Sequence, residues 1–289
     1  MKAAVNLPRW ESLVITEQAS KPVVELLNDY DLLSEKEFPS ADCLNALSRS
    51  FGQRWNGPMF KAQGQFPESE VRYYEEIIGQ DFVVPTREES WHDLFNALIW
   101  IQFPKTKALL NKLHIEDIHE YGVHPRTPRR NKITHFDECG VVLAIEEADL
   151  VDGNALLDAL AKHQWKTVFI SSREIFNSTI HPFIFGHANL EMMLSPFEGL
   201  TGKWLAVVVP NGFNSYSDTL KREVLDSALV KRITELDNFN QADILKPLPL
   251  LGVPGWYEAQ NAEFYDNASY FRPLGKKGQY TSQLPLTRL

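Results

Sequence analysis

The sequence predicts an α+β or α/β fold, in which a largely helical N-terminal half packs on a small mixed β-sheet core with flanking helices. Helical periodicity and capping residues fill the first part of the chain, apolar runs typical of buried strands follow residue 131, and helical patterns surround those runs. The 289 residues fit one large domain. It could divide into residues 1–125, mainly helical, 126–244, containing the sheet, and 245–289, a wrapping tail rich in proline, glycine and aromatic residues.

The opening half is predicted to be all-helical, because apolar residues recur at helical spacing after capping residues or proline. Pro85 and Thr86 interrupt this pattern, and Pro104 interrupts it again. The expected segments are Lys21–Leu27, Cys43–Arg49 capped by Asp42, a helix capped by Ser69 and ending near Gly79, Ser90–Gln102, and Lys105–Lys112.

After this half, the spacing of apolar residues changes from one typical of helices to one typical of strands. Lys132–Asp137 and Val141–Ile145 are β-prone runs separated by Glu-Cys-Gly, which predicts a hairpin. Thr167–Ser171 and Trp204–Pro210 are continuous apolar runs that suit strands buried on both faces. Helical patterns around these strands are expected at Asn154–Lys162, Ala188–Leu194 and Asp218–Leu236.

Composition and charge exclude several classes of protein. The chain is 44% hydrophobic and 23% charged, which is ordinary for a globular protein, and its formal charge of −9 argues against a surface built for nucleic acid or anionic lipid. The N-terminus lacks the apolar run of a signal peptide and no window resembles a membrane span. We therefore expect a soluble, cytoplasmic protein with no membrane partner. Cys43 and Cys139 are too few for a disulfide framework.

The first candidate site lies in Glu-Ser-Trp-His-Asp-Leu-Phe-Asn, where polar residues stand within an apolar helix. His92 and Asn96 are four residues apart and share a helix face, whereas Asp93 points about 100° away. The His-Asp pair resembles that of HD-type phosphohydrolases, but their metal site needs a histidine upstream and none precedes His92. Either His92 serves a site, or it makes a buried hydrogen bond while Asp93 favours the helix dipole.

Two further candidates contain histidine. On a strand, His135 and Asp137 would project from one face and, with Glu138, could hold a divalent cation, although the same residues could simply form a turn. His187 follows Gly186 at the entry of a predicted helix, where it would tend to stay neutral and serve as a base or ligand, or serve only in packing. All eight histidines lie between positions 92 and 187.

The fourth candidate is the basic loop, residues 124–132, which concentrates Arg126, Arg129, Arg130 and Lys132 in an acidic protein. Arginines at this density could bind phosphate, carboxylate or RNA backbone, or could pair with nearby acids as a solvated loop. The chain has no Walker loop, GxGxxG, GxSxG, HExxH or deaminase signature, so the mechanisms that these motifs serve are disfavoured.

Several motifs, taken in order, resemble a bacterial family of unknown function, the DUF3025 proteins. They are Trp-His-Asp-Leu-Phe-Asn-Ala, Ile-Gln-Phe-Pro-Lys-Thr-Lys, Phe-Asp-Glu-Cys-Gly, Phe-Gly-His-Ala, and Pro-Leu-Pro-Leu-Leu-Gly-Val-Pro-Gly-Trp with Phe-Tyr-Asp and Phe-Arg-Pro. The resemblance implies a bacterial, soluble protein with no assigned activity. The positions that match the family pattern are His92, Asp93, Asn96, Asp137, Glu138, His187 and Trp256, whereas at His135 relatives more often carry an apolar residue.

These observations favour an enzyme with a cleft between the helical half and the sheet half. In this hypothesis the catalytic residues are His92, Asp93, Asn96, Asp137, Glu138 and His187, and Arg126, Arg129, Arg130 and Trp256 bind a small anionic substrate. Hydrolysis, with or without the assistance of a divalent metal, is the reaction class expected. The alternative is a non-catalytic protein whose basic loop binds RNA or an acidic partner. The sequence leaves the substrate, the metal and the oligomeric state open.

Overall fold

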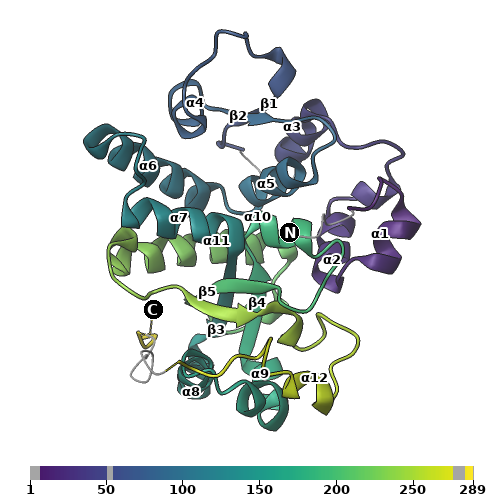
Figure 1. Cartoon of the computed structure of the whole chain (residues 1–289), viewed down its shortest axis with the longest axis vertical. Coiled ribbons are helices and arrows are strands. Elements are labelled where there is room, and N and C mark those ends of the chain that lie inside the picture. Colours follow the sequence, from purple (N-terminus) through teal and green to yellow (C-terminus); the bar gives the residue numbers. More distant parts are fainter. Residues whose placement is uncertain (1–6, 51–54, 276–283, 289) are drawn as a thin grey trace.

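The computed structural model describes residues 7–50, 55–275 and 284–288, and helices predominate in it (Figure 1). The helices are α1 (Ser12–Gln18), α2 (Lys21–Asp29), α3 (Ala41–Ser50), α4 (Tyr74–Asp81), α5 (Trp91–Gln102), α6 (Pro104–Tyr121), α7 (Pro128–Cys139), α8 (Leu150–Ala161), α9 (Arg173–Thr179), α10 (His187–Met192), α11 (Asp218–Glu235) and α12 (Ala262–Asp266). The strands are β1 (Met59–Ala62), β2 (Val83–Thr86), β3 (Gly140–Glu146), β4 (Ile180–Ile184), β5 (Thr201–Val209) and β6 (Lys246–Pro249).

A four-stranded mixed sheet, in the order β4-β3-β5-β6, forms the centre of the molecule. β3 and β5 are parallel, and β4 and β6 add antiparallel at the edges. Residues Gly140 to Ile145 are all buried, since both faces of β3 are covered, and this explains the continuous apolar run. Both edge strands carry proline, Pro182 in β4 and Pro247 and Pro249 in β6, which limits further strand pairing. The predicted α+β class is confirmed.

Helices cover the sheet on both sides. α8 packs on β3, while α7 and α11 contact β5, and in Figure 1 these two groups lie below and above the sheet. α10 contacts both α5 and α7, so three helices from distant parts of the sequence meet above the sheet. This junction positions the polar residues described below. No helix among the described residues is long and apolar enough to cross a bilayer.

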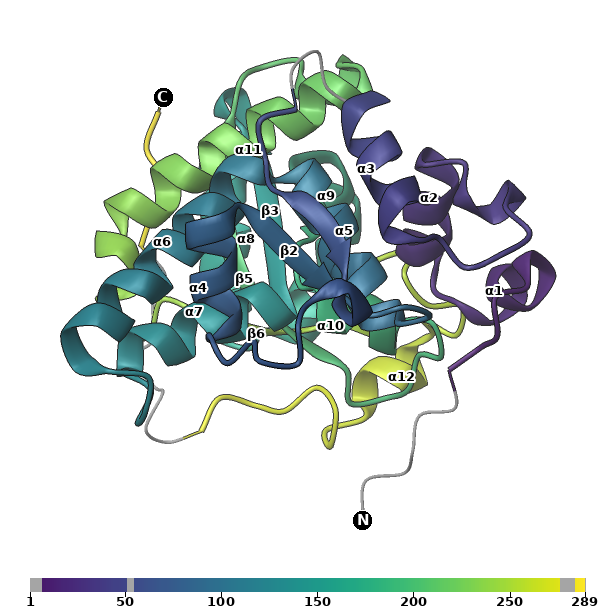
Figure 2. The same cartoon turned by 90° about the horizontal axis from the view of Figure 1, so that it is seen from above.

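The opening half is not all-helical, which corrects the prediction. β1 and β2 form a small parallel sheet beyond α5, and α4 packs beside it, as Figures 1 and 2 show. The side chain of Asn45 supports β1, because it accepts a hydrogen bond from the Phe60 backbone N–H at 2.9 Å and donates to the Phe60 carbonyl at 2.8 Å. The sequence at β2, Val-Val-Pro-Thr, was interpreted as a break because of Pro85, but a two-stranded sheet tolerates proline on its edge.

Two predicted strands are wrong. Lys132–Asp137 lies within α7, which begins after the Thr127 side chain accepts a hydrogen bond from the Arg130 N–H at 3.0 Å and has proline in its first turn. Thr167–Ser171 is a π-helical segment between α8 and α9. The predicted hairpin is therefore absent, and Val141–Ile145 instead pairs with β4 and β5.

The predicted helices and the other two predicted strands are confirmed, although α6 continues to Tyr121, well beyond the predicted end at Lys112. Ser40, rather than Asp42, accepts the capping hydrogen bond of α3 from the Cys43 N–H at 3.3 Å. α4 begins at Tyr74, well after Ser69, and Glu76 accepts a bond from the Tyr73 N–H at 2.9 Å. In the predicted tail, β6 and α12 are regular structure; residues 276–283 and 289 of that tail lie outside the described residues.

Candidate functional site

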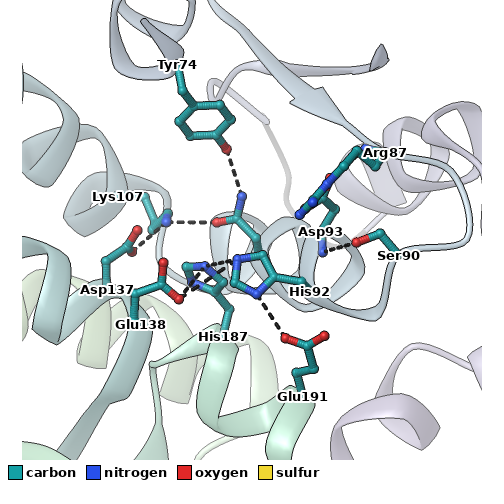
Figure 3. Close-up of polar contacts among 11 residues, drawn as sticks. Tyr74, Arg87, Ser90, His92, Asp93, Lys107, Asp137, Glu138, His187 and Glu191 are labelled. Carbon is teal, nitrogen blue, oxygen red and sulfur yellow. Dashed lines mark hydrogen bonds and ion pairs between the residues drawn. The ribbon is translucent and has the colours of Figure 1, made fainter. Parts of the chain in front are cut away.

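A polar cavity of about 700 Å³ opens between the small sheet with α4 and the helices α5, α6 and α7. All six predicted catalytic residues line it: His92, Asp93, Asn96, Asp137, Glu138 and His187. The remaining wall residues are Gln63, Phe66, Pro67, Glu68, Glu70, Arg72, Tyr73, Tyr74, Glu75, Ile77, Pro85, Arg87, His114, Arg126 and Thr134. The structure therefore brings the predicted catalytic residues into one cavity (Figure 3).

Two histidines and a carboxylate converge at the base of this cavity. The Nε2 atom of His92 lies 3.1 Å from Nε2 of His187, and Oε2 of Glu138 lies 3.4 Å from Nε2 of His187 and 3.9 Å from Nε2 of His92. The potential ligand atoms all lie within 4.8 Å of one another. Because imidazole nitrogen and carboxylate oxygen bind metals well, this cluster could hold one divalent cation.

Helix α5 presents His92 and Asn96 to the cavity. The Ser90 side chain caps the helix by accepting a hydrogen bond from the Asp93 N–H at 3.3 Å. The Asp93 carboxylate in turn accepts bonds from Arg87, at 2.6 Å from the backbone N–H and 2.8 Å from Nη2. Asp93 thus fixes the start of α5 and the strand before it, while its neighbour His92 faces the cluster.

Glycine permits α10 to approach α7 closely. A Cβ atom on Gly186 would lie 2.5 Å from the Glu138 carbonyl oxygen and 2.5 Å from Cα of Cys139. The N–H groups of Phe185 and Gly186 both donate to the Gly140 carbonyl, at 2.9 and 2.8 Å. These backbone contacts place His187, the first residue of α10, directly against Glu138.

Glu191 orients His92 from the next turn of α10. Its Oε2 atom lies 3.0 Å from Nδ1 of His92, which accordingly carries a proton on Nδ1 and directs the Nε2 lone pair toward His187 and Glu138. A carboxylate on the distal nitrogen of a histidine is the usual outer partner of a metal ligand. The hydrogen bond that His92 donates to Glu191 raises the pKa of His92, although partial burial opposes this effect.

Burial shifts the other two groups of the cluster toward their neutral forms. His187 is 4% exposed, and desolvation lowers its pKa to about 3. Desolvation also raises the pKa of Glu138, although His92 and Lys107 lower it. At neutral pH, His187 is therefore an uncharged imidazole that can donate a lone pair to a cation.

A buried lysine links Asp137 to Asn96. Nζ of Lys107, 4% exposed, lies 2.5 Å from Oδ1 of Asp137 and 2.9 Å from Oδ1 of Asn96. Nδ2 of Asn96 donates to the hydroxyl of Tyr74 at 2.8 Å. Desolvation, the largest single effect, acts to raise the pKa of Asp137, but the charge and hydrogen bond of Lys107, together with the neighbouring histidines, outweigh it and the pKa is lowered. Asp137 is thus an ionised partner of Lys107 and lies beside, not within, the cluster of potential ligands.

A second pair of titratable residues, His114 and Glu75, also lines the cavity. His114 is 6% exposed, and its Nδ1 atom lies 4.0 Å from Oε1 of Glu75. Desolvation lowers the pKa of His114 to about 4 and raises the pKa of Glu75. Both groups therefore have neutral forms that are stabilised by burial.

The basic loop is largely engaged within the chain. Arg129 pairs with Asp117 at 2.5 Å, and Arg130 is fully buried and donates to the Val123 carbonyl at 2.7 Å. Lys132 donates to backbone carbonyls near Phe239. Only Arg126 of the predicted loop lines the cavity.

Arg126 differs from the two other arginines of the cavity wall. Arg72 pairs with Glu70 and Asp81, and Arg87 pairs with Asp93. Arg126 instead bonds to two hydroxyl groups, at 2.9 Å to Tyr73 and 3.4 Å to Thr134. Among the described residues it is therefore the cavity arginine whose charge no carboxylate pairs.

Two other predicted residues lie away from the cavity. His135 is exposed on α7, because α7 is a helix and successive residues turn by about 100°; the expected shared face with Asp137 is wrong. Trp256 is 9% exposed and belongs to the hydrophobic core. Arg129 and Arg130, like His135 and Trp256, are not among the residues that line the cavity.

Sequence reasoning missed Lys107, Glu191 and Tyr74. A readable signal existed for Glu191, since it stands four residues after His187 and a helix places such residues on one face. Lys107 is the last residue of the motif Ile-Gln-Phe-Pro-Lys-Thr-Lys. Because lysine side chains are ordinarily exposed, the sequence does not predict its burial. Nothing in the sequence distinguishes Tyr74 from its neighbour Tyr73.

Comparison with protein families gives one match. The model of a family described as "Protein of unknown function (DUF3025)" matches residues 59–275, which contain every residue of the cluster. Comparison with curated proteins and with solved structures returns no match. The match covers most of the chain and agrees with the resemblance of its motifs. The chain belongs to the DUF3025 family.

Proposed function

We propose that the protein is a metal-dependent hydrolase that binds one divalent cation through His92, Glu138 and His187. The observation that carries the proposal is the convergence of two Nε2 atoms and one carboxylate oxygen at the wall of an open cavity. Their separations, 3.1 to 3.9 Å, are all shorter than about 4.2 Å, twice a typical metal–ligand bond length. One ion can therefore contact all three atoms.

The number and surroundings of the ligands favour a catalytic site over a structural one. Structural zinc sites are closed by four protein ligands, whereas three ligands leave positions open to water and substrate. A divalent cation here would polarise a substrate oxygen and lower the pKa of a coordinated water. Within the chain, Glu191 orients His92, and Lys107 keeps Asp137 ionised beside the cluster.

The cavity also supports a small anionic substrate. Of its carboxylates, Glu70, Asp93 and Asp137 are paired with cationic side chains, so their charges are partly neutralised. Arg126 offers free N–H donors near Thr134, which lies one helical turn before Glu138 on α7. A carboxylate or phosphate bound there would place the adjoining part of the substrate near the metal ligands.

The non-catalytic alternative relied on the basic loop as a surface for RNA or an acidic partner. Arg129, Arg130 and Lys132 are bonded to groups of the same chain. These bonds leave the basic loop without the free cationic groups that the alternative requires at Arg129, Arg130 and Lys132.

The test is the metal content of the purified protein, measured by elemental analysis after dialysis against Zn²⁺. We expect one equivalent of zinc in the wild type and a loss of it in His92→Ala and Glu138→Gln. His135→Ala, an exposed histidine of the same helix as Glu138, is the matched control and should keep the metal. Zinc-dependent cleavage of ester, amide or phosphoester probes, abolished by a chelator, would complete the case.

Three results would contradict the proposal. The wild type could bind no stoichiometric metal, or the His135→Ala control could lose it equally. The purified protein could instead retain iron and show oxygen chemistry with no hydrolysis, which the same two-histidine, one-carboxylate arrangement also supports.

A further inference from the structure

We propose that Tyr74 donates a hydrogen bond to the substrate oxygen that gains negative charge in the reaction. This inference rests on the proposed function and identifies the substrate class as a carbonyl or phosphoryl compound. It depends on the directions of two hydrogen bonds, one from Lys107 to Asn96 and one from Asn96 to Tyr74 (Figure 3).

The chain of bonds begins with a group that can only donate. The Lys107 ammonium has three N–H donors and no acceptor. Two of them bond to Asp137 at 2.5 Å and Asn96 at 2.9 Å, and the ammonium also lies 5.4 Å from the centre of the Trp100 ring. Because Lys107 is buried, water does not compete for these positions.

Lys107 fixes the orientation of the Asn96 amide. A cation cannot accept a bond, so the atom of Asn96 that faces it must be the oxygen, Oδ1. The amide nitrogen, Nδ2, then faces the hydroxyl of Tyr74 and donates to it at 2.8 Å. This leaves the hydroxyl proton of Tyr74 free, because its oxygen already acts as the acceptor.

That free proton is directed to the cavity. Tyr74 lines the cavity with His92 and Glu138, and no described residue accepts a bond from its hydroxyl. Asn96, to which Tyr74 is bonded, stands one helical turn from His92 on α5, and both residues line the same cavity as Tyr74. A substrate in this cavity therefore has the Tyr74 hydroxyl and the potential metal ligands in its wall.

The chemistry of such a donor is electrostatic. When water attacks a carbonyl or phosphoryl centre, the oxygen of that centre gains negative charge, and a preorganised donor stabilises it. The proton stays on Tyr74 throughout, so no bond of the tyrosine forms or breaks. The Lys107 charge behind Asn96 strengthens the donor by polarising the chain of hydrogen bonds.

The test uses acetohydroxamate, a small ligand that binds zinc through oxygen atoms and carries negative charge on oxygen. Its dissociation constant for the zinc-loaded full-length protein is measured by isothermal titration calorimetry. Tyr74→Phe keeps the ring and removes the donor, and we expect binding roughly 10- to 100-fold weaker with the zinc stoichiometry unchanged. Tyr121→Phe, at the exposed end of α6, is the control and should bind as the wild type does.

A second variant keeps the Tyr74 hydroxyl but changes the group to which this hydroxyl donates its hydrogen bond. Asn96→Asp keeps the acceptor for Lys107 but replaces the donor to Tyr74 by an acceptor, so Tyr74 would turn its proton to the new carboxylate. We expect Asn96→Asp to weaken acetohydroxamate binding with Tyr74 still present, and the double variant to bind no more weakly than Tyr74→Phe alone.

The outcomes separate the inference from the proposed function. If Tyr74→Phe retains zinc and binds acetohydroxamate as tightly as the wild type, the inference fails and the metal site stands. If Tyr74→Phe loses zinc, Tyr74 supports the fold of the site and the donor role is likewise overturned. If the wild type itself takes up no zinc, the proposed function fails and the inference with it.

Discussion

Nε2 of His92 lies 3.1 Å from Nε2 of His187, and the two rings meet edge to face. Two imidazole lone pairs cannot face each other at this distance without something between them, so the pair shares either a proton or a cation. Glu138 contributes a carboxylate oxygen to the same point, which favours the cation. This contact joins α5 to α10 across 95 residues of sequence.

Glu191 should control the affinity for the metal without controlling the fold. Replacing Glu191 by Gln removes the charged partner of His92 Nδ1, and we expect zinc affinity to fall about 10- to 100-fold. Competition with a chromogenic chelator measures this change. Glu258→Gln, at an exposed position, is the control; an equal loss there, or no loss at position 191, would contradict the role of Glu191.

Gly186 should be required for the approach of α10 to α7. A methyl group at this position meets backbone atoms at 2.5 Å, which cannot give way as a flexible side chain could. We expect Gly186→Ala to lower the free energy of unfolding by about 1–3 kcal/mol and to weaken zinc binding by moving His187. Gly64→Ala has open space around its Cβ and should change neither property. Urea denaturation and chelator competition measure the two effects; unchanged zinc binding in Gly186→Ala would count against the account.

The contributions of Lys107 and Asp137 to the free energy of unfolding should be strongly coupled. Lys107→Met leaves the Asp137 carboxylate without its cation, and we expect a loss of about 3–5 kcal/mol in the free energy of unfolding. Adding Asp137→Asn removes the stranded charge, so the double variant should recover much of this loss. Urea denaturation of the wild type, Lys107→Met, Asp137→Asn and the double variant gives the coupling energy between the two residues. Additive losses would show that the two residues stabilise the fold independently.

His114 should make stability depend on pH. Its folded pKa is about 4, against an ordinary value of 6.5, so below pH 6.5 the unfolded chain takes up a proton that the folded protein excludes. The free energy of unfolding should therefore fall by about 1.4 kcal/mol per pH unit from this group as pH falls from 6.5 towards 4, and its contribution should be constant above 6.5.

Urea denaturation at several pH values tests this dependence. His114→Gln should lose stability less steeply than the wild type below pH 6.5, whereas His119→Gln, an exposed histidine on the same helix, should follow the wild type. Parallel curves for wild type and His114→Gln would show that burial of His114 does not govern the acid response.

Much of the fold could be predicted from local patterns. β3 and β5 were found because each contains a continuous apolar run that is buried on both faces, and α5 and α11 because their helical periodicity is long. Thr167–Ser171 shows the limit, since a short apolar run suits a buried helical turn as well as a strand. The segment Lys132–Asp137 was misassigned although the Thr-Pro start of α7 was visible in the sequence.

The candidate site could be predicted only in part. His92 and Asn96 were found because polar residues inside an apolar helix need a partner or a role, and His187 because it begins a predicted helix. Glu138 was predicted from a strand and turn that the structure replaces by α7. Their distances depend on how α10 packs between α5 and α7, which no local pattern contains. Lys107 was missed for the same reason, because only the tertiary fold buries it against Asp137.

The most direct test of the metal site is a crystal structure of the zinc-loaded protein, with anomalous diffraction recorded on both sides of the zinc absorption edge. The account predicts one zinc peak about 2.0–2.2 Å from Nε2 of His92, Nε2 of His187 and a carboxylate oxygen of Glu138, with Glu191 still bonded to Nδ1 of His92. A zinc-loaded crystal with no peak at this point, and with the two Nε2 atoms still in direct contact, would contradict it.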